Sequence, residues 1–208
     1  MIKNIIYAIL LGVGMAACLS QQDKEGDATA NAASETTLVD TDITEEAAPI
    51  TPDPSTFVIG KERVGNVAIG MPIEQMREQV PAGYTIADTT LKQEGMQSTA
   101  YLLHPKDKDK GILIEQSCEP DCRVWRINVK SSDFKTPKGI GVESKYGEVQ
   151  RFYPISTVTL ADGGLVAVSK EGGISFVLDQ SQLPQNRLND FTPETIPANT
   201  IVKSILIY

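Results

Sequence analysis

The feature that most constrains the fold is an internal match between two segments of the chain. Residues 67–81 align with residues 140–154 without a gap, at a constant offset of 73. Each copy has a short β-type run and then apolar residues at positions i, i+3 and i+7, a spacing that places three side chains on one face of a two-turn helix. These are Ile73, Met76 and Val80 in the first copy, and Tyr146, Val149 and Tyr153 in the second. A proline ends each pattern, so we expect two short helices in corresponding places.

Strand-like runs follow each expected helix, and glycine and aspartate residues mark the turns between them. Consecutive hairpins imply antiparallel pairing. The sequence therefore predicts an α+β domain over residues 57–208, made of two tandem helix-plus-antiparallel-sheet repeats at about 57–131 and 132–208. Because a unit of about 70 residues is marginal alone, the two repeats should share one core. The expected strands are 84–91, 98–104, 111–117, 123–130, 157–160, 164–168, 174–178 and 200–208.

Residues 1–17 have the pattern of a secretory signal peptide. Lys3 precedes an apolar run from Ile5 to Met15, and small residues then lead to Cys18. As a helix the apolar run spans about 16 Å, too short for a bilayer core of about 30 Å. The alternatives are an ordinary signal peptide followed by an incidental cysteine, and an uncleaved anchor.

The four residues Met15-Ala16-Ala17-Cys18 resemble the lipobox of bacterial lipoproteins. In that family the cysteine becomes the new N-terminus and carries a thioether-linked diacylglycerol, usually with an N-acyl chain. The resemblance implies lipidation of Cys18 and firm anchoring to the membrane, because several acyl chains hold where one holds only marginally. It also implies a location in the cell envelope, and Leu19, in place of Asp after the cysteine, favours the outer membrane, with the domain on the periplasmic or the cell-surface side.

Residues 18–56 are expected to form a disordered acidic tether. The segment holds nine acidic residues, one basic residue and no aromatic residue. It cannot bury enough apolar surface to offset its ordering entropy. The formal net charge of −8 resides in this segment, because residues 57–208 hold 18 acids and 17 bases. A nearly balanced domain has no basic footprint of the kind that nucleic-acid binding requires, so no nucleic-acid partner is expected.

The two cysteines of the domain lie between two expected strands, in Ser117-Cys-Glu-Pro-Asp-Cys122. In an exported protein Cys118 and Cys122 most simply form a disulfide, here across a hairpin end. A redox pair is the alternative, but three residues rather than two separate the thiols, and no thioredoxin-like βαβ pattern flanks them. Zinc would need four ligands, and only His104 could join the thiols. We therefore expect no metal and no cofactor.

Two apolar features are candidates for contact with a partner. Strand alternation places Trp125 on the same side as Ile127, which favours a core position over an exposed hot spot. The connection 179–200 is long for a compact domain, and such connections are often functional. It is the candidate partner-contacting loop, through Leu188 and Phe191.

The run Ile69-Gly70-Met71, the short helix and the proline after it resemble the opening of SmpA/OmlA-type outer-membrane lipoprotein domains. Tandem copies are similar to the two helix-plus-sheet repeats of the β-lactamase inhibitor protein, although Glu143 stands in the second copy where the first has Gly70. Neither resemblance supplies a catalytic residue. Together they imply a membrane-anchored, non-enzymatic lipoprotein that binds another envelope protein. The alternatives are an inhibitor of an extracytoplasmic enzyme and, less favoured, an envelope hydrolase.

Overall fold

The computed structural model describes residues 53–93, 96–161 and 164–208. The expected signal peptide, Cys18 and nearly all of the expected tether lie outside the described residues. The folded part begins slightly earlier than expected, with a short 3-10 helix η1 (Pro54–Phe57). The Asp53 carboxylate accepts a hydrogen bond of 2.9 Å from the Ser55 backbone N–H, and Thr56 is buried.

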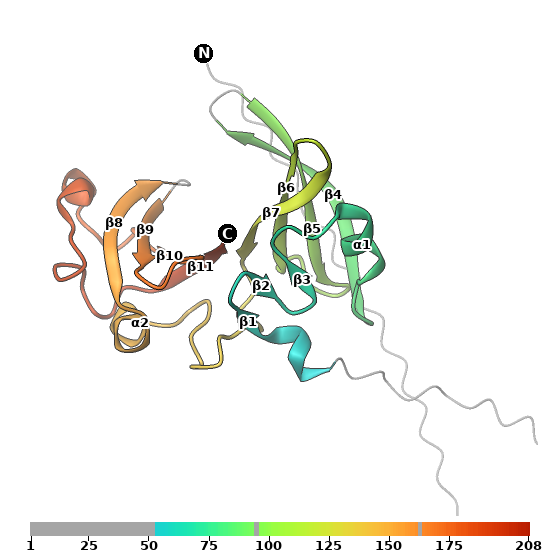
Figure 1. Cartoon of the computed structure of the whole chain (residues 1–208). Coiled ribbons are helices and arrows are strands. Elements are labelled where there is room, and N and C mark those ends of the chain that lie inside the picture. Colours follow the sequence, from blue (N-terminus) through green and yellow to red (C-terminus); the bar gives the residue numbers. More distant parts are fainter. Residues whose placement is uncertain (1–52, 94–95, 162–163) are drawn as a thin grey trace, which may run out of the picture. The chain divides into compact units, whose positions relative to one another are not determined.

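The domain is mostly β-sheet, with an eight-stranded antiparallel sheet at its centre (Figure 1). The strand order is β4-β5-β6-β7-β11-β10-β9-β8, so the two central strands are β7 and β11. All eight strands lie where the sequence predicted them: β4 (Tyr84–Gln93), β5 (Met96–Pro105), β6 (Ile112–Cys118), β7 (Cys122–Val129), β8 (Ile155–Ala161), β9 (Gly164–Ser169), β10 (Ile174–Leu178) and β11 (Val202–Ile207).

One face of the sheet carries the hydrophobic core. A row of apolar residues, paired from strand to strand, crosses the whole sheet on this face: Ile86, Leu103, Ile112, Val129, Ile205, Phe176, Ala167 and Val158. Such a row is possible because alternate residues of a strand point to the same face. Leu103, Ile112, Val129, Ile205, Phe176 and Ala167 are at most 4% exposed, which makes this row the centre of the core.

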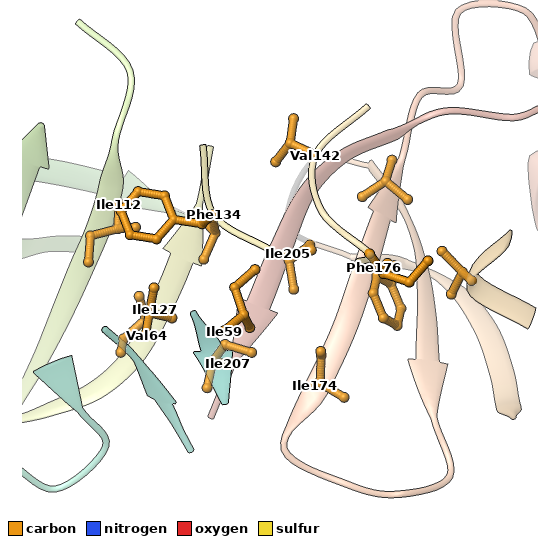
Figure 2. Close-up of a cluster of buried hydrophobic side chains, with 14 of the residues drawn as sticks. Ile59, Val64, Ile112, Ile127, Phe134, Val142, Ile174, Phe176, Ile205 and Ile207 are labelled. Atoms are coloured by element: carbon orange, nitrogen blue, oxygen red, sulfur yellow. The ribbon is translucent and has the colours of Figure 1, made fainter. Parts of the chain in front are cut away.

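Two short helices and a small second sheet cover the core face. The helices α1 (Ile73–Glu78) and α2 (Tyr146–Phe152) confirm the two expected helices, and the apolar residues of their predicted faces pack into the core. The three-stranded sheet consists of β1 (Ile59–Gly60), β2 (Arg63–Val64) and β3 (Val67–Ala68). Figure 2 shows Ile59 and Val64 of this sheet beside Ile207 and Ile127 of the large sheet.

The connection between β10 and β11 also packs on the core side. It contains a 3-10 helix, η2 (Gln185–Asp190), and its Leu183 and Ile196 belong to the core cluster. The Tyr146 hydroxyl and the Gln150 side-chain amide both donate to the Pro193 carbonyl, at 3.0 and 2.8 Å. The connection is therefore held against α2.

Candidate binding face of the sheet

The opposite face of the large sheet, called here the outer face, is formed by the other residue of each alternating pair. One row of paired residues again crosses all eight strands: Ala87, Leu102, Leu113, Asn128, Leu206, Ser175, Val168 and Thr157. Val166, Val177 and Leu206 form a small buried cluster of their own on this face. Each of the four described helical segments contributes at least one apolar side chain to the core cluster on the other face: Phe57, Met76, Val149 and Leu188.

Trp125 is exposed, contrary to the expectation from strand alternation. In the β6–β7 pairing, Gln116 lies opposite Val124 and Glu115 lies opposite Arg126, so Trp125 is an extra residue in β7. A β-bulge of this kind interrupts the alternation of side chains. Val124 is buried in the core, whereas Trp125 is 50% exposed. The expectation that Trp125 packs in the core was wrong, because it assumed an uninterrupted strand.

Arg126 links the exposed ring to the sheet. Its Nε and Nη2 atoms donate to the two carboxylate oxygens of Glu115, both at 2.9 Å. Its guanidinium carbon lies 5.4 Å from the centroid of the Trp125 ring. The Arg126 and Glu115 side chains are only 13% and 7% exposed. A two-fold hydrogen-bonded pair orients the guanidinium, and the guanidinium in turn packs on the indole ring.

The disulfide predicted between Cys118 and Cys122 is confirmed. Cys118 ends β6, Cys122 begins β7, and the two residues are paired across the hairpin. The bond closes the end of the hairpin close to the bulge, which limits the motion of the strand segment that carries Trp125.

Leu188 and Phe191 lie away from this surface. Both side chains are half-buried and pack against the core cluster, within the β10–β11 connection that α2 holds. The structure therefore does not bring the expected loop residues together with Trp125. Their contact with a partner stays a prediction.

Two kinds of feature are absent from the described part of the chain. Within it, no group of three or more His, Cys, Asp or Glu side chains is arranged to hold a metal ion. No helix among the described residues is long and apolar enough to cross a membrane.

Comparison with known proteins finds a likeness of fold. The chain is similar to the crystal structure of the uncharacterised protein yfeY from Escherichia coli, with a TM-score of 0.55 and 17% sequence identity. The likeness covers 72% of this chain and 98% of that chain. The sequence matches no protein-family model, and no curated protein matches it. At 17% identity the comparison concerns the fold alone, and the fold is one that this chain shares with yfeY.

Proposed function

We propose that the protein is a non-enzymatic lipoprotein of the bacterial cell envelope whose domain binds another envelope protein through the outer face around Trp125. The lipobox-like residues before Cys18 support the membrane anchor, and the acidic segment after it supports a tether. The observation that carries the binding role is the half-exposed Trp125, placed by a bulge beside Arg126.

The chemistry of this surface suits protein recognition. Tryptophan and arginine are over-represented among residues that dominate binding energy at protein interfaces. A tryptophan can bury roughly 150–250 Å² in all, and half of the Trp125 surface is still exposed for a partner to cover. The Glu115 ion pair and the Cys118–Cys122 bond hold the ring and its strand in place before binding, so little conformational entropy is lost on association.

We also propose that the two halves of the domain arose by duplication, as the offset of 73 predicts. In each half a short helix precedes four consecutive strands of the sheet, β4–β7 or β8–β11. Similar hydrogen bonds support this proposal, because each segment before a helix donates a backbone N–H to the last strand of its own half. The donor and acceptor are Gly70 and Val124 at 2.7 Å in one half, and Glu143 and Val202 at 2.9 Å in the other. A bulge residue follows each acceptor: Trp125 or Lys203.

The binding role can be tested by cross-linking intact cells and identifying the captured proteins by mass spectrometry. We expect Trp125→Ser to reduce capture of the specific partner about tenfold or more, because the dominant contact is lost. Phe152→Ser is the matched control, since Phe152 is 43% exposed and lies at the end of α2. Equal capture by the wild type and both variants would contradict a role for Trp125.

The inhibitor alternative is favoured by the same disulfide-closed hairpin, because rigid segments suit insertion into an enzyme. Cross-linking separates the two possibilities. An inhibitor would capture an extracytoplasmic enzyme, and the purified protein would lower the activity of that enzyme.

The anchor is tested by labelling cells with palmitate. Cys18→Ala should abolish incorporation of the label and release the protein from membranes, because the acylated sulfur is absent. The double variant Cys118→Ser with Cys122→Ser is the control and should retain the label. Label in the Cys18→Ala protein would exclude lipidation at this residue.

A further inference from the structure

A second feature of the outer face lies at the C-terminal end of β7, beyond Trp125. It is a cavity of about 340 Å³, where β7 ends, β11 begins and β10 ends. Both halves of the sheet contribute to it. Its polar lining consists of Lys110, Asn128 and Lys130 from one half and Gln180, Lys203 and Ser204 from the other.

The described part of the lining is strongly positive. Lys110, Lys130 and Lys203 all border the cavity, and none of the described residues that line it is acidic. Among the described residues none of these three lysines forms an ion pair within 4.0 Å. Lys203 interacts electrostatically with the Asp179 carboxylate, which is not part of the lining. The Ser181 backbone and side chain are the main cause of the lowered pKa of Asp179, to which Lys203 adds.

Lys203 reaches the cavity because of a second bulge. The β10–β11 pairing shifts by one residue, so that Lys203 is left without an opposite residue in β10. The residues on either side are buried, Val202 in the core and Ser204 beside the cavity, while Lys203 is exposed. Uninterrupted alternation would have pointed residue 203 into the core. The bulge instead lets the Lys203 ammonium group reach the cavity.

Two amide side chains in the lining have incomplete hydrogen bonding. The oxygen atoms Oδ1 of Asn128 and Oε1 of Gln180 are buried and accept no hydrogen bond within the described part of the protein. The nitrogen atoms of the same two amides are not buried without a partner. Because both residues line the cavity, these NH2 groups are accessible from it. Leaving a buried oxygen without a donor is unfavourable, and in native proteins such groups call for an explanation.

We propose that this cavity binds a small organic oxyanion, a phosphate ester or a carboxylate with more than one acidic group. Three ammonium groups, two amide NH2 groups and the Ser204 hydroxyl can all donate hydrogen bonds to its oxygens. Charge-assisted donors of this kind are the strong ones, and the volume suits a ligand of small-metabolite size. The site is distinct from the protein-binding surface at Trp125 and goes beyond the function proposed above.

The proposal is tested by titration calorimetry on the full-length protein with four probes. Glucose 6-phosphate represents a phosphate ester, and citrate represents a polycarboxylate. Glucose carries no acidic group, and acetate carries only one. We expect at least one of the first two probes to bind with a dissociation constant below about 1 mM, and glucose and acetate to bind at least tenfold more weakly. Added NaCl should weaken the binding, because the attraction is electrostatic.

Variants assign the binding to the cavity. Lys130→Gln and Lys203→Gln should each weaken binding about tenfold, the effect expected for loss of one charge-assisted hydrogen bond. Asn128→Asp, which replaces an NH2 donor by a charged oxygen without a change of size, should abolish it. Lys170→Gln is the matched control, because Lys170 is exposed and follows the far end of β9.

Side-chain amide resonances give a second readout that does not depend on the variants. On addition of the bound probe, the NH2 signals of Asn128 and Gln180 should shift in NMR spectra of the full-length protein. Absence of binding by both acidic probes would overturn the proposal. Equal weakening by Lys170→Gln and Lys203→Gln would overturn it as well, and so would unshifted NH2 signals at saturation.

Discussion

Gly70 and Glu143 share the same left-handed backbone conformation, with φ angles of 80° and 72°. Each lies three residues before the first residue of a helix, α1 or α2. Glycine adopts this conformation without a steric penalty, whereas a residue with a Cβ atom is strained there by about 1 kcal/mol or more. The chain thus follows a similar backbone path before both helices, and only the path before α2 is strained.

The strain at Glu143 predicts a stabilising substitution. Glu143→Gly should raise the free energy of unfolding by up to about 1 kcal/mol, after the greater freedom of glycine in the unfolded chain is subtracted. Gly70→Ala should lower it by about 1 kcal/mol, because an added Cβ at Gly70 meets nothing within 4 Å and only the backbone is strained. Urea denaturation measures both changes. Glu171→Gly is the control, and an equal gain from it would contradict the strain at Glu143.

The ion pair behind Trp125 should be important for stability. Glu115→Ala removes the carboxylate from a guanidinium that is only 13% exposed, and we expect a loss of about 3 kcal/mol or more in urea denaturation. Replacing both residues, Glu115→Leu with Arg126→Met, should restore part of that loss. The contrasting case is the exposed pair of Arg77 and Asp88, where Asp88→Ala should cost less than about 1 kcal/mol. Similar losses for Glu115→Ala and Asp88→Ala would contradict this account.

The hairpin disulfide should contribute modestly. Replacing Cys118 and Cys122 with serine should lower the free energy of unfolding by about 2 kcal/mol, because the closed loop is short. The wild type measured in reductant should then match the double variant measured without it. A difference between these two samples would show that the serines act through something other than the bond.

Two buried tyrosines predict a loss of stability in alkali. Burial raises the pKa of Tyr84 to about 12, with smaller contributions from Asp133 and Asp107. Burial likewise raises the pKa of Tyr146 to about 12. In the unfolded chain a tyrosine has a pKa of about 10. Because the unfolded state loses its proton first, the contribution of these two tyrosines to stability should be constant below about pH 10 and fall as the pH rises toward 12.

The alkaline loss can be measured as the urea midpoint at a series of pH values. Tyr84→Phe should make the fall shallower, because phenylalanine has no proton to lose. Tyr146→Phe should do the same and should also lower stability at neutral pH by about 1 kcal/mol, since the Tyr146 hydroxyl donates to the Pro193 carbonyl. An unchanged alkaline slope in both variants would contradict the raised pKa values.

The sequence predicted the strands and helices of the domain because each carries a local pattern. Glycine and aspartate turns bound the apolar runs of β9 and β10, and the i, i+3, i+7 spacing marks α1 and α2. The small sheet β1–β3 escaped prediction, since strands of two residues each are too short to show a period. The pairing of β7 with β11 joins residues far apart in the chain, and no local pattern reports it.

The candidate sites were predictable only where one short segment contains them. The disulfide partners lie four residues apart, and their pairing was predicted correctly. Trp125 was misplaced because the bulge depends on how β7 meets Glu115 and Gln116 of another strand. The cavity lysines stand at positions 110, 130 and 203 and meet only after the two halves of the sheet have joined.

The place of β11 has a consequence for how the protein is made. Residues 202–207 pair with β7 on one side and β10 on the other. Until they arrive, a growing chain exposes two unpaired strand edges in the middle of the future sheet. Open edges of this kind can capture a strand from a neighbouring molecule. Correct folding therefore depends on keeping nascent copies apart until the late strand has closed the gap.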